Sequence, residues 1–258
     1  MELFLQADTW VALLTLTFLE IILGIDNIIF ISITAGKLPQ KSQKKAINIG
    51  LLLAMVFRIL LLLGVSYLIA MKDPFFSFDL SWFKADLTGQ SLVLVAGGIF
   101  LLYKSTSEIH QKVEGTEHKA SKTKAITTSF LKIIIQIVLI DIVFSFDSVL
   151  TAVGMTTGVD GALMIMIIAV IVSILIMMIF ATPVSDFVNK HPTIQMLALS
   201  FLILIGFMLI TEGAHLSNAI VFQQHVGAIP KGYLYFAIAF SLGVEALNMK
   251  LRKKGTVS

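Results

Sequence analysis

Long apolar segments recur along the whole chain and are separated by shorter polar ones. Most are near the twenty residues that an α-helix needs to cross the roughly 30 Å hydrocarbon core of a bilayer. A β-barrel would instead show alternating segments of about ten residues. The expected fold is an all-α polytopic membrane protein, and the third span is expected to continue through Lys104 toward Ile109. The predicted spans are 9–34, 46–70, 91–104, 127–153, 161–182, 194–214 and 231–249, with a loop between Pro183 and Pro192.

Composition and charge placement refine this prediction. The chain is 57% hydrophobic and only 14% charged, whereas soluble domains carry about 25% charged residues. Lysine and arginine follow the first, third, fifth and seventh spans, and acidic residues dominate the opposite side. Cytoplasmic loops are enriched in positive charge, so the N-terminus is expected outside and the C-terminus in the cytoplasm. The pI of about 9.0 therefore reflects topology, and no nucleic-acid partner is expected.

Two carboxylate pairs interrupt the apolar pattern, one in the first span and one in the fourth. Each pair has two acids six residues apart, and a small polar residue follows the second acid. Two matches of this shape are much harder to obtain by chance than one. The residues are Glu20, Asp26 and Asn27 in LEIILGIDNIIF, and Asp141, Asp147 and Ser148 in LIDIVFSFDSVL.

The positions of these pairs predict an inverted repeat. The first and fourth spans each open a set of three, and the charge distribution runs the two sets in opposite directions. Many secondary transporters have this 3+3 architecture, with ion sites near the bilayer midplane between the repeats. The expected organisation is a single transmembrane domain over 1–258, with repeats at 9–104 and 127–214, a cytoplasmic loop at 105–126 and an unpaired seventh helix at 231–249.

Carboxylates at this depth must be neutralised. Each charge at the bilayer centre costs roughly 2.5–3.5 kcal/mol on insertion scales, so four would cost about 10–14 kcal/mol. Protons, cations or Arg58 in the second span can compensate them. Six residues of straight helix separate two side chains by about 9 Å and 120°, so one ion could not contact both acids of a pair. A break in the first helix near Gly24–Asp26 is therefore expected, with freed carbonyls as further ligands.

The candidate ligands are almost all oxygens, which suit Mn²⁺, Mg²⁺ or Ca²⁺. The chain has no cysteine, and neither motif span contains histidine. No Gly-rich phosphate loop, nucleophile elbow or HExxH motif is present, so an enzyme is not expected. Accessory or gating roles are assigned to charged residues in other spans and to the glycine between the first two acids. These residues are Gly24, Arg58, Lys104, Glu212 and Glu245. For the charged residues, a structural role or simple exposure to solvent is left open as an alternative.

At these residues the sequence resembles the TerC family of integral membrane proteins, in the short form without appended cytoplasmic domains. The resemblance rests on LEIILGIDNIIFIS, GGIFLLYKSTSEIH, FSFDSVLTAVG, HPTIQMLALSFLILIGFMLITEG and FSLGVEALNM. It implies a multi-pass protein of the bacterial plasma (inner) membrane, related to cation and amino-acid exporters, and it adds Mn²⁺ as the ion and efflux as the direction. It also implies metal contacts at the six residues of the two motifs. No permanently bound cofactor is expected.

The resulting prediction is a secondary transporter that exports a divalent cation, Mn²⁺ first, by alternating access. Asp26 and Asp147 are expected to contact the ion, with Glu20 and Asp141 as further ligands or proton carriers. Exchange for protons, a homo-oligomer and contact with the secretion machinery are left open. Two alternatives remain: a non-transporting scaffold that aids metal loading or secretion of exported proteins through the 105–126 loop, and a Ca²⁺ or Na⁺ exchanger.

Overall fold

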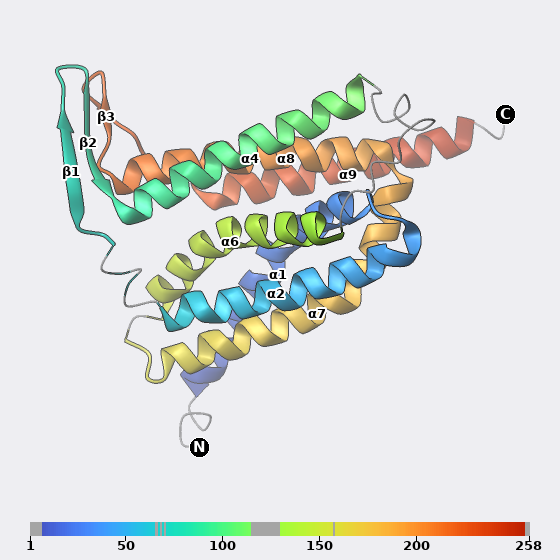
Figure 1. Ribbon diagram of the computed structural model, residues 1–258, viewed down its shortest axis with the longest axis horizontal. Coiled ribbons are helices and arrows are strands. Elements are labelled where there is room, and N and C mark those ends of the chain that lie inside the picture. Colours follow the sequence, from blue (N-terminus) through green and yellow to red (C-terminus); the bar gives the residue numbers. More distant parts are fainter. Residues whose placement is uncertain are drawn as a thin grey trace. The chain divides into compact units, whose positions relative to one another are not determined.

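The structure is a computed structural model that describes residues 7–64, 67, 69, 71–114, 130–156 and 158–255. The side chains of Ala7, Ile25, Asp26 and residues 252–255 lie outside this description. Within the described residues, seven helices are long and apolar enough to cross a membrane, as the hydrophobic pattern predicts. They are α1 (Ala7–Ala35), α2 (Gln40–Leu63), α4 (Gly89–Val113), α6 (Phe130–Met155), α7 (Ala162–Lys190), α8 (Pro192–Leu216) and α9 (Lys231–Gly255), shown in Figure 1.

The third helix is longer than its apolar core. α4 continues past Lys104 to Val113, which confirms the expected extension. The first part of the 105–126 segment is therefore helical rather than loop. Residues 115–126 of that segment lie outside the described part of the chain.

The predicted loop between Pro183 and Pro192 is wrong. α7 continues through Pro183 to Lys190, and α8 begins at Pro192. Proline removes one helical hydrogen bond, but membrane helices tolerate this loss where neighbouring groups satisfy the freed carbonyl. Ser185 and Val188, on the turn after Pro183, are buried, so packing holds this part of the helix. Pro192 lies at the first position of α8, where its missing N–H is not needed.

The expected break near Gly24–Asp26 is also wrong, because α1 is helical from Ala7 to Ala35. Gly24 provides room for a neighbour rather than flexibility. A Cβ atom on Gly24 would clash with the thioether of Met177 in α7. The glycine therefore allows α1 and α7 to approach closely.

A small sheet corrects the all-α prediction. β1 (Pro74–Asp79), β2 (Phe83–Thr88), β3 (Ile220–Val221) and β4 (Gln224–His225) form four strands in the order β1-β2-β3-β4. β2 pairs antiparallel with β3, placing Phe83 opposite Val221. Aromatic residues favour strands, and the PFFSFD segment is rich in them. The two hairpins precede α4 and follow α8 (Figure 1).

The helices form two compact units. The first contains α1, α2, α6 and α7, and the second contains α8, α9, the sheet and nearly all of α4. In the first unit α6 packs against both α1 and α2. A Cβ on Gly50 of α2 would lie 2.7 Å from Ile137 Cγ2 of α6, so this glycine permits the contact.

In the second unit small residues also bring helices together. A Cβ on Gly98 of α4 would lie 2.5 Å from the carbonyl oxygen of Gly206 in α8. Close approach at small residues is typical of membrane helices, where packing replaces the hydrophobic effect as the main attraction. α9 packs against α8.

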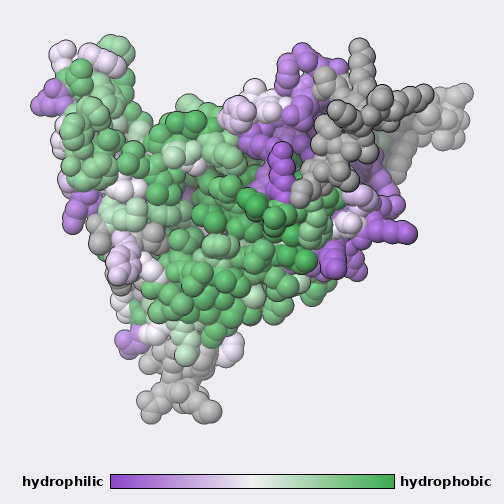
Figure 2. Space-filling model, viewed as in Figure 1, coloured by the Kyte–Doolittle hydropathy of each residue, from purple (hydrophilic) through white to green (hydrophobic). Residues whose placement is uncertain are grey.

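Apolar side chains also cover the outside of the helices. Leu14 and Phe18 of α1 and Leu60 of α2 are exposed. Figure 2 shows hydrophobic side chains over α2 and α7, with hydrophilic ones gathered near the turn between α1 and α2. This distribution is the one expected of helices whose outer faces contact lipid.

Candidate ion-binding site

Three charged side chains from three helices meet inside the first unit. Glu20 of α1, Arg58 of α2 and Asp141 of α6 are 3%, 2% and 3% exposed. α2 follows α1 after a short turn, and α6 packs against both. Residues 114 or more positions apart along the chain, such as Asn27 and Asp141, are thereby brought to hydrogen-bond distance.

Arg58 binds both carboxylates. Its Nη1 donates to Glu20 Oε2. Its Nη2 donates to Asp141 Oδ1 at 2.8 Å, and its Nε donates to Asp141 Oδ2 at 3.2 Å. The two bonds to Asp141 form the bidentate arrangement for which the planar guanidinium is suited.

Two polar side chains complete this network. Ser145 Oγ donates to the main-chain carbonyl of Asp141 at 2.5 Å and also lies 3.0 Å from Asp141 Oδ2. Asn27 Nδ2 donates to Asp141 Oδ1 at 3.3 Å. The other end of the Asn27 amide differs, because its Oδ1 is buried without a hydrogen-bond partner. A buried acceptor without a partner costs about 1–3 kcal/mol, so this oxygen is a place where a cation or water would be stabilised.

The spacing of the residues explains the geometry. Residues four and then three positions apart lie on one helix face. Both motifs place an acid, a small residue and a polar residue at this spacing, and all of these positions are buried. The face consists of Glu20, Gly24 and Asn27 on α1, and Asp141, Ser145 and Ser148 on α6.

The second acid of the α6 motif, Asp147, lies off this face. Asp147 is half-buried on α6, and its main-chain carbonyl accepts a hydrogen bond from Thr151 Oγ1 at 3.0 Å. The Asp26 side chain lies outside the described part of the structure, so its predicted ion contact stays a prediction. Among the side chains that are described, no three Asp, Glu or His residues are close enough to hold one ion.

Two serines of α6, Ser148 and Ser145, lie on this face, and only Ser148 was predicted as a ligand. Ser148, a predicted ligand, is buried and donates to the Ser145 carbonyl at 3.3 Å. Ser145 was not among the predicted site residues, although it contacts Asp141 directly. The signal for it was present in the sequence, since Ser145 is a hydroxyl residue four positions after an intramembrane acid.

The remaining accessory candidates lie in the second unit. Lys104 of α4 forms an ion pair with Glu108 at 2.5 Å, and Glu108 is 1% exposed. Glu212 in α8 is half-buried, and so is Glu245 in α9, which accepts a hydrogen bond from Asn248 at 3.4 Å. Their gating roles stay predictions.

Comparison with known proteins decides the family. The family model described as integral membrane protein TerC family matches residues 5–255. The chain belongs to the TerC family. It is a multi-pass protein of the bacterial plasma (inner) membrane, in agreement with its seven potential membrane-spanning helices.

Relatives of this TerC-family chain include proteins of similar length. The UPF0053 inner membrane protein YgdQ of Escherichia coli K12 is 45% identical over 247 residues, covering 96% of this chain and 95% of the relative. A UPF0053 protein of Haemophilus influenzae Rd is 42% identical over 246 residues, covering 95% of each. The longer YoaE of Escherichia coli K12 is 42% identical over 254 residues, covering 98% of this chain and 45% of the relative. No solved structure matches the chain.

Proposed function

We propose that this TerC-family protein is a secondary transporter that exports a divalent cation, Mn²⁺ before other ions, by alternating access. The family resemblance favours Mn²⁺ and the export direction. The buried network in the first unit supports a cation path through the chain. The proposal includes an inverted repeat with the N-terminus outside and the C-terminus in the cytoplasm, which is the framework that alternating access would use.

One observation carries the proposal: the buried Glu20–Arg58–Asp141 network contains an unsatisfied oxygen, Asn27 Oδ1. A structural ion-pair network would be expected to satisfy each buried polar atom, because an unsatisfied one destabilises the fold. The network also carries more negative than positive groups, since two carboxylates share one guanidinium. An additional cation would compensate both features.

In the proposed mechanism, before a cation binds, the guanidinium of Arg58 partly neutralises the carboxylates of Glu20 and Asp141. An entering cation would take oxygen ligands from the motif faces, and Arg58 would lose its contact with at least one carboxylate. Asp26 and Asp147 are retained as proposed ligands, together with Ser148. Hard divalent cations accept this ligand set of carboxylate, amide and hydroxyl oxygens.

Proton exchange is a further part of the proposal. Carboxylates that bind a metal must release their protons, so metal binding and proton release are linked at such a site. Mn²⁺ flux should therefore respond to an imposed pH gradient. Flux that neither moves protons nor responds to the gradient would remove the coupling while leaving the cation path intact.

The direct test is Mn²⁺ flux through purified protein in liposomes that contain an Mn²⁺-sensitive dye. We expect flux in the wild type and at least a tenfold loss in Asp141→Asn and in Asp26→Asn combined with Asp147→Asn. Asp160→Asn is the matched control, because Asp160 is an exposed carboxylate between α6 and α7. Each variant is first checked for a monodisperse, folded state in detergent.

The outcomes separate the alternatives. Folded wild-type protein without flux of Mn²⁺, Ca²⁺ or Na⁺ would reject the transporter and favour the scaffold. Competition by Ca²⁺ or Na⁺ that exceeds that of Mn²⁺ would instead identify an exchanger for those ions. Equal flux in the wild type and in Asp141→Asn would show that the network is not the ion path.

Asn27 offers a sharper test of ligand chemistry. Asn27→Leu removes the unsatisfied oxygen and a long hydrogen bond while keeping the volume similar. Loss of a metal-site contact typically lowers affinity by about 10–100-fold, so we expect the Mn²⁺ concentration for half-maximal flux to rise by that factor. The midpoint of thermal unfolding in detergent should change little. A large fall in this midpoint with unchanged affinity would assign Asn27 to packing alone.

A further inference from the structure

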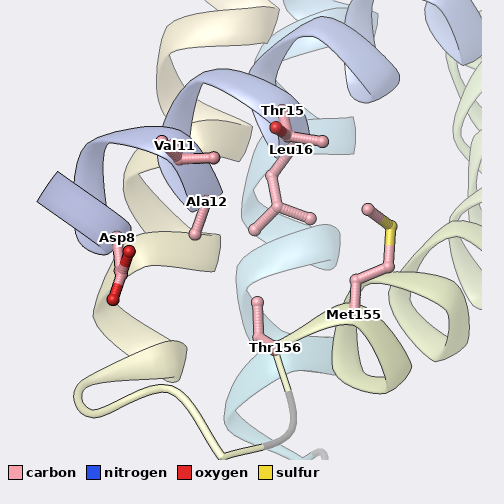
Figure 3. A pocket seen from close by; sticks show the side chains of 7 residues that line it. All are labelled: Asp8, Val11, Ala12, Thr15, Leu16, Met155 and Thr156. Carbon is pink, nitrogen blue, oxygen red and sulfur yellow. The ribbon is translucent and has the colours of Figure 1, made fainter.

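A pocket opens in the first unit between the beginning of α1 and the end of α6. Its volume is about 250 Å³, and Figure 3 shows the side chains that line it. Asp8 provides a carboxylate at one edge, and the side chain of Leu16 extends from α1 toward Thr156 and Met155 at the end of α6 (Figure 3). The volume suits a small hydrated ion, because each water takes roughly 30 Å³ of liquid volume.

The pocket lies at the extracellular end of these helices by the charge rule. α1 begins there and ends at the turn before α2, where the lysines of the LPQKSQKK segment gather. Positive charge marks the cytoplasmic side, so the opposite end of α1 faces outward. An exported ion would leave by this end.

Leu16 links the pocket lining to the helix face that carries the ion-binding network. It lines the pocket, is 2% exposed, and lies four residues before Glu20 on the same face of α1. One helical turn places Glu20 about 6 Å deeper than Leu16. Leu16 is thus a buried apolar side chain one helical turn before Glu20 on this face.

The facing helix continues the same route. The buried part of α6 between the pocket and the network carries small or hydroxyl-bearing side chains that lead to Asp141, interspersed with the apolar Phe146 and Val149. In order from the pocket inward the small or hydroxyl-bearing residues are Thr156, Ala152, Ser148 and Ser145, followed by Asp141.

We propose that this pocket is a water-filled, cation-selective outer vestibule of the transport path, and that Leu16 closes it from Glu20. The inference rests on the proposed function and adds an exit site to it. Asp8 gives the vestibule its preference for cations, since a carboxylate at the mouth of a low-dielectric cleft concentrates positive ions there. The alternative occupant is a lipid chain, because Val11 and Thr15 at the pocket are exposed.

Cysteine labelling tests the vestibule directly, since the chain contains no native cysteine. Single variants Ala12→Cys and Thr15→Cys place thiols in the pocket, and Leu14→Cys, whose parent residue is 65% exposed on the apolar surface, is the control. In intact cells we expect a membrane-impermeant methanethiosulfonate to modify both pocket cysteines and not the control. Pocket cysteines as unreactive as Leu14→Cys would overturn the vestibule in favour of a lipid-filled crevice.

Reagent charge tests the cation preference. A cationic methanethiosulfonate should modify Ala12→Cys about tenfold faster than an anionic one. With Asp8→Asn added, the two reagents should modify Ala12→Cys at similar rates. With Asp160→Asn added instead, the tenfold difference should remain, because Asp160 is on the same side but outside the pocket lining. If the ratio of the two modification rates is the same with and without Asp8→Asn, the cation selectivity is overturned.

A deeper cysteine tests the closure by Leu16. Ala152→Cys lies one turn inward from Thr156 on α6. We expect it to be unreactive with Leu16 or Leu16→Met, which keeps the volume, and reactive with Leu16→Ala. Equal reactivity in all three backgrounds would overturn the closure. These rates are measured without flux, so a failed transport assay removes the proposed function, whereas unreactive pocket cysteines remove only the vestibule.

Discussion

At the residue scale, Arg58 is the centre of the buried network. It is held between Glu20 and Asp141, and all three side chains are almost completely buried. Removing one partner of a buried charge pair leaves the other charge buried without compensation. This is much more destabilising than replacing every charged partner by an uncharged residue of similar volume. This asymmetry distinguishes the network from a surface ion pair, which typically contributes at most about 1 kcal/mol.

Arg58→Met should therefore destabilise the protein by about 3–5 kcal/mol. Replacing the acids as well, with Glu20→Gln and Asp141→Asn, should recover much of this loss because no buried charge remains. The measurement is the unfolding midpoint in detergent for the single and triple variants. His110 and Glu114, an exposed pair at 3.2 Å, provide the control, and Glu114→Gln should leave the midpoint unchanged. A triple variant no more stable than Arg58→Met would contradict this account.

At the element scale, glycines set how closely the helices approach. Gly50 faces Ile137, which is fully buried and β-branched, whereas Gly24 faces the flexible end of Met177. β-branched side chains have restricted χ1 rotamers, but methionine can adapt to a changed space. Gly243 of α9 has no heavy atom within 4 Å of the Cβ position. The three positions thus present a stiff neighbour, an adaptable neighbour and open space.

The same substitution should have three different effects. Gly50→Ala should destabilise by about 1–3 kcal/mol through overpacking, and Gly24→Ala should destabilise by less. Gly243→Ala should be neutral or stabilising by up to about 1 kcal/mol, because alanine favours helix. Unfolding midpoints in detergent measure the series, and Gly50→Ala as harmless as Gly243→Ala would contradict it.

Much of this organisation could be predicted at the element scale. The seven helices follow from apolar length, and the carboxylate faces follow from spacing along a helix. The continuity of α1 could not be predicted from the sequence. A glycine inside a helix can mark either a break or a close contact with another helix, and only the position of its neighbour, Met177, decides between them. Arg58 was predicted as a possible counter-ion for these carboxylates, but its contact with both Glu20 and Asp141 depends on which helices are neighbours. The sheet depends on pairing between segments over 130 residues apart.

At the scale of the whole molecule, the 3+3 repeat stays a prediction, and the two units can be compared with it. Corresponding helices of the two repeats share a unit, since α1 occurs with α6 and α2 occurs with α7 in the first, and α4 occurs with α8 in the second. Such sharing is expected if the chain has two equivalent halves that interleave. The predicted opposite orientation of the halves would follow from an odd number of spans in each, and it stays a prediction.

Topology can be measured with the same cysteine-free background. Ser81→Cys lies in the exposed turn between β1 and β2, and Gln40→Cys lies at the exposed start of α2. We expect an impermeant maleimide to label Ser81→Cys in intact cells and Gln40→Cys only after permeabilisation. Neither substitution alters the lysines that define the orientation. The reverse labelling pattern would place the N-terminus in the cytoplasm and invert the proposed path.

The pairing of Glu20 with Arg58 also has a consequence for biogenesis. Both residues belong to the first helical hairpin, α1 and α2, which is synthesised long before α6. Either charge would cost roughly 2.5–3.5 kcal/mol if it entered the bilayer alone, whereas the hairpin can enter with the two charges paired. Asp141 then arrives on α6 and meets a guanidinium already in place. We therefore expect Arg58 to lower the cost of inserting Glu20 at an early stage of synthesis and to pair with Asp141 at a later one.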